Sequence, residues 1–160
     1  MRAAIVTIST SKAAGEGDDE SGPLLEAFAR QLGARIVARE LLADDRAAIE
    51  SALARLCDGE GVDLVLTTGG TGPAPSDVTP EATLAVIERE IPGIAEAMRL
   101  ASRPHTAHWM LSRGVAGVRG HSLIVNFPGS PKSVQEVSAE LAPALRHALA
   151  LIAGTAAPHA

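Results

Sequence analysis

The chain has 160 residues, enough for one domain with a core of its own, and 46% of them are hydrophobic although only 2% are aromatic. Its formal net charge is −5, with no run of basic residues, which argues against a nucleic-acid-binding surface. A single cysteine, Cys57, excludes an intramolecular disulfide, and no apolar stretch has the length of a membrane span, so we expect a cytoplasmic protein with no nucleic-acid or membrane partner.

The first half of the chain alternates between strand-like and helix-like segments. Ser21 is a candidate N-cap for the first of the helices, and Gly33 is a candidate stop signal. The expected elements are a strand at residues 3–8, a polar loop at 9–22, a helix at 23–32, a strand at 35–42, and a helix that Asp44 or Asp45 caps and that runs to about Cys57.

A third strand leads directly into a glycine-rich turn, which is the most informative part of the sequence. Val62, Leu64, Val65 and Leu66 are apolar, as in a strand buried on both faces, and residues 67–72 read TTGGTG. Glycines there can adopt positive φ and let phosphate oxygens approach the backbone N–H groups. Asp77 follows where it can hold Mg²⁺ against such a phosphate, and Thr79 and Pro80 are expected to begin a helix as N-cap and N1 residue. This pattern favours a nucleotide or phosphate-ester site.

A purely structural explanation of the same turn stays open. Tight strand-to-helix connections often need glycine, and Asp77 can be a turn residue that accepts hydrogen bonds from backbone N–H groups. The turn is not a P-loop, because no lysine follows its last glycine, and it is not a G-x-G-x-x-G dinucleotide fingerprint.

The second half of the chain continues the alternation. Pro92 and Gly93 separate two segments with a helical pattern. Ser133 and Glu136 form a capping box at the start of the last helix. The expected elements are a helix at residues 80–90, a helix at 94–101, a strand at 122–127, a last helix running to about Ile152, and a frayed tail at 155–160. Residues 1–154 are therefore expected to form a single α/β domain, a three-layer sandwich with a mostly parallel central sheet and helices on both faces.

Polar segments follow four of the predicted strands. Ligands of open α/β sheets bind outside the carboxyl ends of the strands, so we expect these segments to meet in one crevice. Such a meeting would bring Asp44 and Asp77 together, and two carboxylates beside a phosphate suit Mg²⁺. Either aspartate alone is more often a cap than a catalyst, but the pair favours catalysis. The segments are residues 9–11, 44–45, 67–77 and 126–132.

Four motifs in this order resemble one known family. They are TTGGTGPAPSDVTPEAT, PGIAEAMR, MLSRGVAGVRG and LIVNFPGSPKS, and the likeness runs from about Ala4 to Ala153. The chain is similar to the molybdopterin adenylyltransferases of molybdenum-cofactor biosynthesis, which include the Mog and MoaB proteins and the G domain of gephyrin. The resemblance implies transfer of an adenylyl group from Mg²⁺-ATP to molybdopterin with release of pyrophosphate. It also implies a homotrimer, or a hexamer as in many MoaB members, and delivery of the product to a molybdenum insertase.

The resemblance also implies roles for individual residues. Asp44 and Asp77 match the two essential aspartates, which position Mg²⁺ and phosphate and so act as both catalytic and metal residues. The residues matching nucleotide or phosphate contacts are Asp19, Ser21, Gly22, Gly69, Gly70, Thr71, Gly72 and Lys132, the last of which fits a solvated lysine equally well. The residues assigned to the pterin are Ser9, Ser102, Asn126, Pro128, Gly129 and Ser130.

One departure from the family stands after the first strand. The family commonly reads Ser-Asp there, whereas this chain has Ser9 and Thr10, and Thr10 supplies no carboxylate. We therefore consider Asp18 or Asp19, from the same loop, as a replacement for that charge.

The remaining polar and aromatic residues point to structural roles. His105 and His108 stand at helical spacing but lack a third ligand in register, so a zinc site is not expected. Trp109 is expected to pack in the chain or against another subunit. Ion pairing, within the chain or across an interface, is expected for Arg99, Arg113 and Arg119.

Two other functions remain alternatives at this stage. The chain can be a molybdopterin-binding or carrier subunit without catalysis, or a nucleotide hydrolase on the same fold. Retention of both aspartates favours the transferase, because passive binding should not need two acids.

Overall fold

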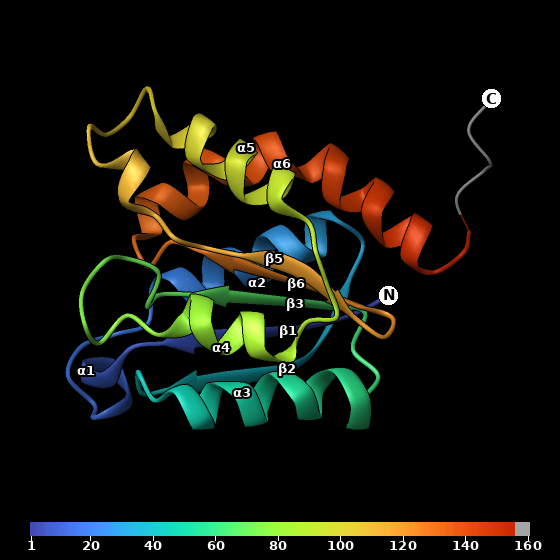
Figure 1. Cartoon of the computed structure of the whole chain (residues 1–160), viewed down its shortest axis with the longest axis horizontal. Helices are drawn as coiled ribbons and strands as arrows, with labels where there is room; N and C mark the ends of the chain where they lie inside the picture. Colours follow the sequence, from blue (N-terminus) through green and yellow to red (C-terminus); the bar gives the residue numbers. More distant parts are fainter. Residues whose placement is uncertain (156–160) are drawn as a thin grey trace.

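The structure, a computed structural model that describes residues 1–155, is built around a six-stranded sheet (Figure 1). The strand order is β2-β1-β3-β6-β5-β4, in which β2, β1, β3 and β6 run parallel and β5 and β4 are antiparallel to their neighbours. The expected mostly parallel sheet is thus confirmed. The strands are β1 Arg2–Ile8, β2 Arg35–Leu42, β3 Leu64–Thr68, β4 Arg89–Glu90, β5 Ala116–Arg119 and β6 Ser122–Phe127.

Helices cover both faces of the sheet, which makes three layers (Figure 1). One face carries α2 Ser21–Gln31, α5 Pro92–Ser102 and α6 Pro131–Ile152; the other carries α3 Arg46–Ala54, its π-helical continuation Arg55–Gly59, and α4 Thr79–Val86. Two short helices lie outside these layers, α1 Thr10–Ala13 and the 3₁₀ turn η2 Trp109–Leu111.

Alternation along the central strands divides the aliphatic core between the two faces. Ala3 and Ile5 of β1 pack with α2, α5 and α6, whereas Ala4 and Val6 pack with α3 and α4. Successive strand side chains point to opposite faces, so a strand covered on both sides must be apolar at nearly every position. The exposed fraction of every β3 side chain is correspondingly near zero.

The carboxyl ends of the parallel strands meet at one edge of the sheet. Ile8 pairs with Leu42, and Thr68 pairs both with Thr7 and with Phe127. The polar segments that leave β1, β2, β3 and β6 therefore start side by side, at the edge where the parallel rule predicted a ligand site.

The predicted helix at residues 80–90 is wrong in its last part. α4 ends at Val86, Ile87 is extended, and Glu88 and Ile91 donate backbone hydrogen bonds to β5. The short antiparallel strands β4 and β5 were not expected, because strands of two and four residues are too short to show a readable period. Gly120 at φ +55 turns β5 into β6, as glycine does at the first position of a type II′ hairpin.

Three predicted helix caps are also wrong, although Asp45 caps α3 as expected, its carboxylate accepting from Ala48 N. Ser21 and Thr79 lie inside their helices, and their hydroxyls donate instead to carbonyl oxygens of distant loops. The last helix is capped by Ser130 rather than Ser133 and begins at Pro131.

The expected tail overlaps the described chain only at Thr155, whose N–H donates to Ala150 O; the rest of it lies outside the described residues. In residues 1–155, no helix combines the length and apolar character needed to cross a membrane.

Candidate active site

The glycine turn after β3 is wedged between the ends of β1 and β6. Gly69 has φ +99, and a Cβ on it would collide with the carbonyl oxygen of Ile8. Its N–H donates to Phe127 O at 3.3 Å, and a Cβ on Gly129 would lie 3.2 Å from the Gly69 Cα. Only glycine leaves room for these three strand ends to meet around the turn.

Asp44 is held at this turn by Thr10. Its Oδ2 accepts from both the backbone N and the Oγ1 of Thr10, at 2.8 Å each, and the Asp44 N–H donates back to that hydroxyl at 3.0 Å. Oδ1 lies 3.0 Å from where a Cβ of Gly70 would stand. One oxygen of the carboxylate is thus anchored, and the other faces the glycine turn.

Asp77 closes a tight turn on the other side of the glycines. Its N–H donates to Ala74 O at 2.9 Å, and its Oδ2 accepts from Ala74 N at 3.0 Å. The same oxygen lies 2.8 Å from a Cβ position built on Gly72. The side chain is only half-buried, so it can still meet a ligand.

The two carboxylates therefore flank one turn. Asp44 lies against Gly70 and Asp77 against Gly72, whose Cα atoms are at most about 7 Å apart because two peptide units separate them. Within residues 1–155, the backbone N–H groups of Gly70, Thr71 and Gly72 donate no hydrogen bond to the protein. Free donors between two acids are suited to phosphate oxygens with a bridging cation.

The donor set fits Mg²⁺ rather than a metal held only by the protein. No group of three or more His, Cys, Asp or Glu side chains gathers to hold a metal within the described chain. Mg²⁺ is usually bound by one or two carboxylates together with substrate phosphates and waters, and Asp44 and Asp77 supply that number.

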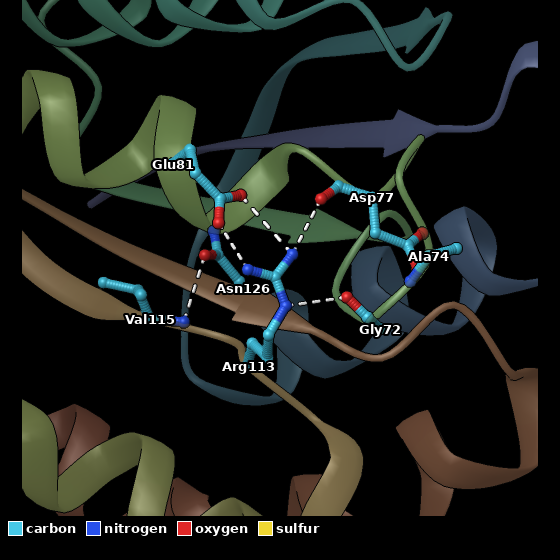
Figure 2. A network of polar contacts seen from close by, with 7 residues as sticks. All are labelled: Gly72, Ala74, Asp77, Glu81, Arg113, Val115 and Asn126. Carbon is cyan, nitrogen blue, oxygen red and sulfur yellow. Dashed lines mark hydrogen bonds and ion pairs between the residues drawn. The ribbon is translucent and has the colours of Figure 1, made fainter.

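Arg113 ties the turn to the first turn of α4 (Figure 2). Its Nε donates to Gly72 O at 2.8 Å, and its Nη2 donates to Asp77 O at 2.7 Å. Its backbone N–H donates to Thr71 O at 2.9 Å, and its guanidinium pairs with the Glu81 carboxylate. The Arg113 hydrogen bond holds the pKa of Glu81 below its ordinary value. The expected ion pair of Arg113 is confirmed, and it lies within the chain.

The segment around Asp19 is bound into the fold. The Asp19 carboxylate accepts from Thr7 Oγ1 at 2.7 Å and from Gly22 N at 2.9 Å, so it caps the start of α2 and contacts β1. A Cβ on Gly22 would collide with that carboxylate. The predicted nucleotide contacts of this segment, Ser21 included, stay predictions, and the structure adds a structural role for Asp19.

Asn126 is buried, and its amide is fully used inside the protein. It is 1% exposed, its Nδ2 donates to Thr67 and Thr83 Oγ1 at 3.0 Å each, and its Oδ1 accepts from Val115 N. The amide thus joins β6 to β3 and α4. Figure 2 shows its contact with Val115. Ser102 ends α5 at 8% exposure. The predicted pterin contacts of both residues, and that of Ser9 at the cap of α1, stay predictions.

The segment after β6 is held by hydroxyls from β3 and α2. Thr68 Oγ1 donates to Pro128 O at 2.8 Å, and Ser21 Oγ donates to Gly129 O at 3.1 Å. Lys132 follows on α6, where its side chain is 78% exposed and its Nζ lies 3.8 Å from Glu136 Oε1. This segment and the turn thus lie side by side, while Lys132 projects outward.

Arg119, His105 and Trp109 contact groups other than the two aspartates. Arg119 forms an ion pair with Asp58 at the opposite end of β5. His105 Nδ1 lies 3.5 Å from Glu136 Oε1, and Trp109 packs under the guanidinium of Arg103 at 5.9 Å.

Thr10 is the site residue whose role sequence reasoning missed, since only its lack of a carboxylate was noticed. We expect Thr10→Val to lower kcat/KM about tenfold, because a hydrogen bond to a charged group is worth about 1.5–3 kcal/mol. Thr10→Ser keeps the hydroxyl and should retain most of the activity. Steady-state kinetics of both variants measure the difference, and equal rates for Val and wild type would contradict this role.

Comparison with known proteins agrees with the geometry. The family described as "Probable molybdopterin binding domain" matches residues 4–147. A molybdopterin adenylyltransferase of Helicobacter pylori J99 is 47% identical over 115 residues, which are 72% of this chain but 65% of that protein, so less than two thirds of its length is matched. The Escherichia coli K12 molybdopterin adenylyltransferase is 44% identical over 138 residues, 85% of this chain and 71% of that protein. The crystal structure of the molybdopterin biosynthesis enzyme MoaB from Thermus thermophilus superposes with a TM-score of 0.90 at 44% identity, covering 96% of each chain.

Proposed function

This chain belongs to the family of molybdopterin-binding domains, and from that premise we propose that it is a molybdopterin adenylyltransferase of molybdenum-cofactor biosynthesis. The observation that carries the proposal is the placing of Asp44 and Asp77 on either side of one glycine turn with free N–H groups. Relatives that are 44–47% identical carry that activity in their names.

The reaction is an in-line phosphoryl displacement. A terminal phosphate oxygen of molybdopterin attacks the α-phosphorus of ATP, a new P–O–P bond forms, and pyrophosphate leaves with the electron pair of the broken bond. A general base is not required, because a phosphate monoester is largely ionised at neutral pH. Positioning and charge neutralisation therefore supply most of the rate.

The residues of this chain divide that work. Mg²⁺, when bound, neutralises charge on the triphosphate and on the departing pyrophosphate. Asp44 and Asp77 would hold it from the two sides of the turn, with Thr10 fixing the first carboxylate. The N–H groups of Gly70, Thr71 and Gly72 would bind the oxygens of the phosphate chain, as backbone amides do in other anion sites.

We place the assembled enzyme in the cytoplasm, as a homotrimer that passes adenylylated molybdopterin to a separate molybdenum insertase. Leu100 on α5 and Met110 and Leu111 in η2 support the association, because they are large, apolar and about half exposed or more on elements in contact. Light scattering of the purified protein distinguishes a trimer from a hexamer.

Pyrophosphate release tests the function directly. Purified protein with ATP, molybdopterin and Mg²⁺ should release pyrophosphate and form adenylyl-molybdopterin in equal amounts. Chelation of the metal should stop the reaction, and added Mg²⁺ should restore it, because the carboxylates alone repel the triphosphate. Tight pterin binding with no release would instead identify a carrier, and ATP consumption without pterin would identify a hydrolase.

A further inference from the structure

The guanidinium of Arg113 donates hydrogen bonds to the carbonyl groups at both ends of the loop that carries Asp77. Gly72 opens this loop and Asp77 closes it, and both carbonyl oxygens accept hydrogen bonds from Arg113. The Arg113 backbone N–H binds Thr71, one residue before the loop. The residue therefore fixes the span of the loop through carbonyl groups at both of its ends.

The Asp77 carboxylate has little other support. Its Oδ2 accepts one hydrogen bond, from Ala74 N, and Ala74 belongs to the same loop. The side chain thus turns with the loop backbone and, among residues 1–155, makes no hydrogen bond or ion pair with a strand or a long helix. By contrast, Asp44 is anchored by the backbone and the hydroxyl of Thr10, the first residue of α1, two residues after β1 ends. Control of the direction of the Asp77 carboxylate must come through whatever holds the loop.

Only arginine can supply these contacts together. Nε and Nη2 of the guanidinium donate to the two loop carbonyls, and Nη1 and Nη2 donate to the Glu81 carboxylate. The N–H groups of one rigid plane thus reach acceptors in three directions. A lysine ammonium carries donors at one point and cannot span these acceptors. Glu81, at the first turn of α4, orients the plane and balances its charge.

We propose that Arg113 is a positioning residue for Asp77, which sets the carboxylate that meets the metal and the triphosphate without touching either. The inference rests on the function proposed above. Arg113 and Glu81 are 38% and 40% exposed, and ion pairs that are exposed to this degree contribute little to stability. Loss of the guanidinium should consequently appear in catalysis far more than in folding.

Arg119 offers a matched control. It too donates to a carboxylate, Asp58, and to a backbone carbonyl, Val86 O, but at the opposite end of β5. We expect Arg113→Gln to lower kcat about 100-fold, the cost of misplacing a catalytic group by about 1 Å. The Mg²⁺ concentration for half-maximal rate should rise about tenfold, because a misdirected carboxylate binds the metal less well. Arg119→Gln should leave both values within about threefold of wild type.

Arg113→Lys tests the shape of the side chain rather than its charge. We expect this variant to lose at least about tenfold in kcat, because the lysine ammonium carries its donors at one point and replaces a planar group with separated donors. Wild-type kinetics in either Arg113 variant, an unchanged Mg²⁺ requirement, or an equal loss in Arg119→Gln would each overturn the proposal.

Hydrogen exchange separates this inference from the proposed function. The amides of Asp77 and Thr79 donate to Ala74 O and Gly70 O, so their exchange reports the loop without any substrate. Both should exchange faster in Arg113→Gln than in wild type and be unchanged in Arg119→Gln. If the wild-type protein released no pyrophosphate, the proposed adenylyltransferase function would be wrong. Faster amide exchange in Arg113→Gln would still support the positioning of the loop by Arg113, and unchanged exchange would overturn it.

Discussion

Replacing Asp77 by asparagine is expected to lower kcat by at least about 10²–10³-fold, the usual cost of removing one preorganised electrostatic group. Asparagine has the same shape and can still accept from Ala74 N, so the loop should keep its turn. What is lost is the negative charge that holds the cation on this side of the glycines. The KM for molybdopterin should change little, because the change removes metal positioning rather than pterin contacts. Pyrophosphate release under saturating ATP measures kcat.

Asp45→Asn is the control for this experiment. Asp45 neighbours Asp44, the other proposed metal-binding residue, but serves as the N-cap of α3, a role that asparagine fills equally well. Its turnover should stay near that of wild type. An Asp77→Asn enzyme with undiminished turnover would remove Asp77 from the catalytic site.

Gly69→Ala is expected to destabilise the fold by about 2–5 kcal/mol. Left-handed backbone costs a residue with a Cβ about 1–2 kcal/mol. Overpacking against neighbours that cannot move adds about 1–3 kcal/mol. At this position the obstacle is the backbone carbonyl of Ile8, at the end of a strand paired on both sides. Urea denaturation of variant and wild type gives the difference in the free energy of unfolding.

Gly33→Ala separates the two costs. Gly33 has φ +90, close to that of Gly69, but a Cβ on it meets no atom of residues 1–155 within 4 Å. It should lose only the conformational part, about 1–2 kcal/mol. Equal destabilisation of the two variants would show that the close approach of Ile8 to the turn is not what requires glycine.

Much of the site followed from a topological rule. Asp44 and Asp77 are 33 residues apart in the sequence, yet both follow segments that were predicted to be strands. Because parallel strands share a carboxyl edge, their meeting could be predicted without coordinates. The roles of Thr10 and Arg113 could not. Thr10 lies in a predicted polar loop, and Arg113 precedes β5, a strand that was not predicted. Neither residue is part of a sequence pattern that indicates its hydrogen-bond partner.

The misassigned caps have a related cause. A serine or threonine before a helical pattern reads as an N-cap, since local hydrogen bonds satisfy helix N–H groups. The hydroxyls of Ser21 and Thr79 instead donate to the carbonyl oxygens of Gly129 and Gly69, because carbonyl groups in packed loops need hydrogen-bond donors. Such carbonyls become neighbours only when the chain is folded.

The sequence by itself determined the order of the main strands and helices, the burial of the parallel sheet on both faces and the chemistry available at the glycine turn. These follow from period and residue type, which are local properties. Three features became known only from the tertiary structure. They are the antiparallel edge made by β4 and β5, the hydrogen bonds of hydroxyls to loop carbonyls, and the hydrogen bonds of the Arg113 guanidinium to both ends of the Asp77 loop. The reason is physical: each of these contacts joins groups that lie far apart along the chain, and the energy of such a contact exists only after the core has brought its ends together.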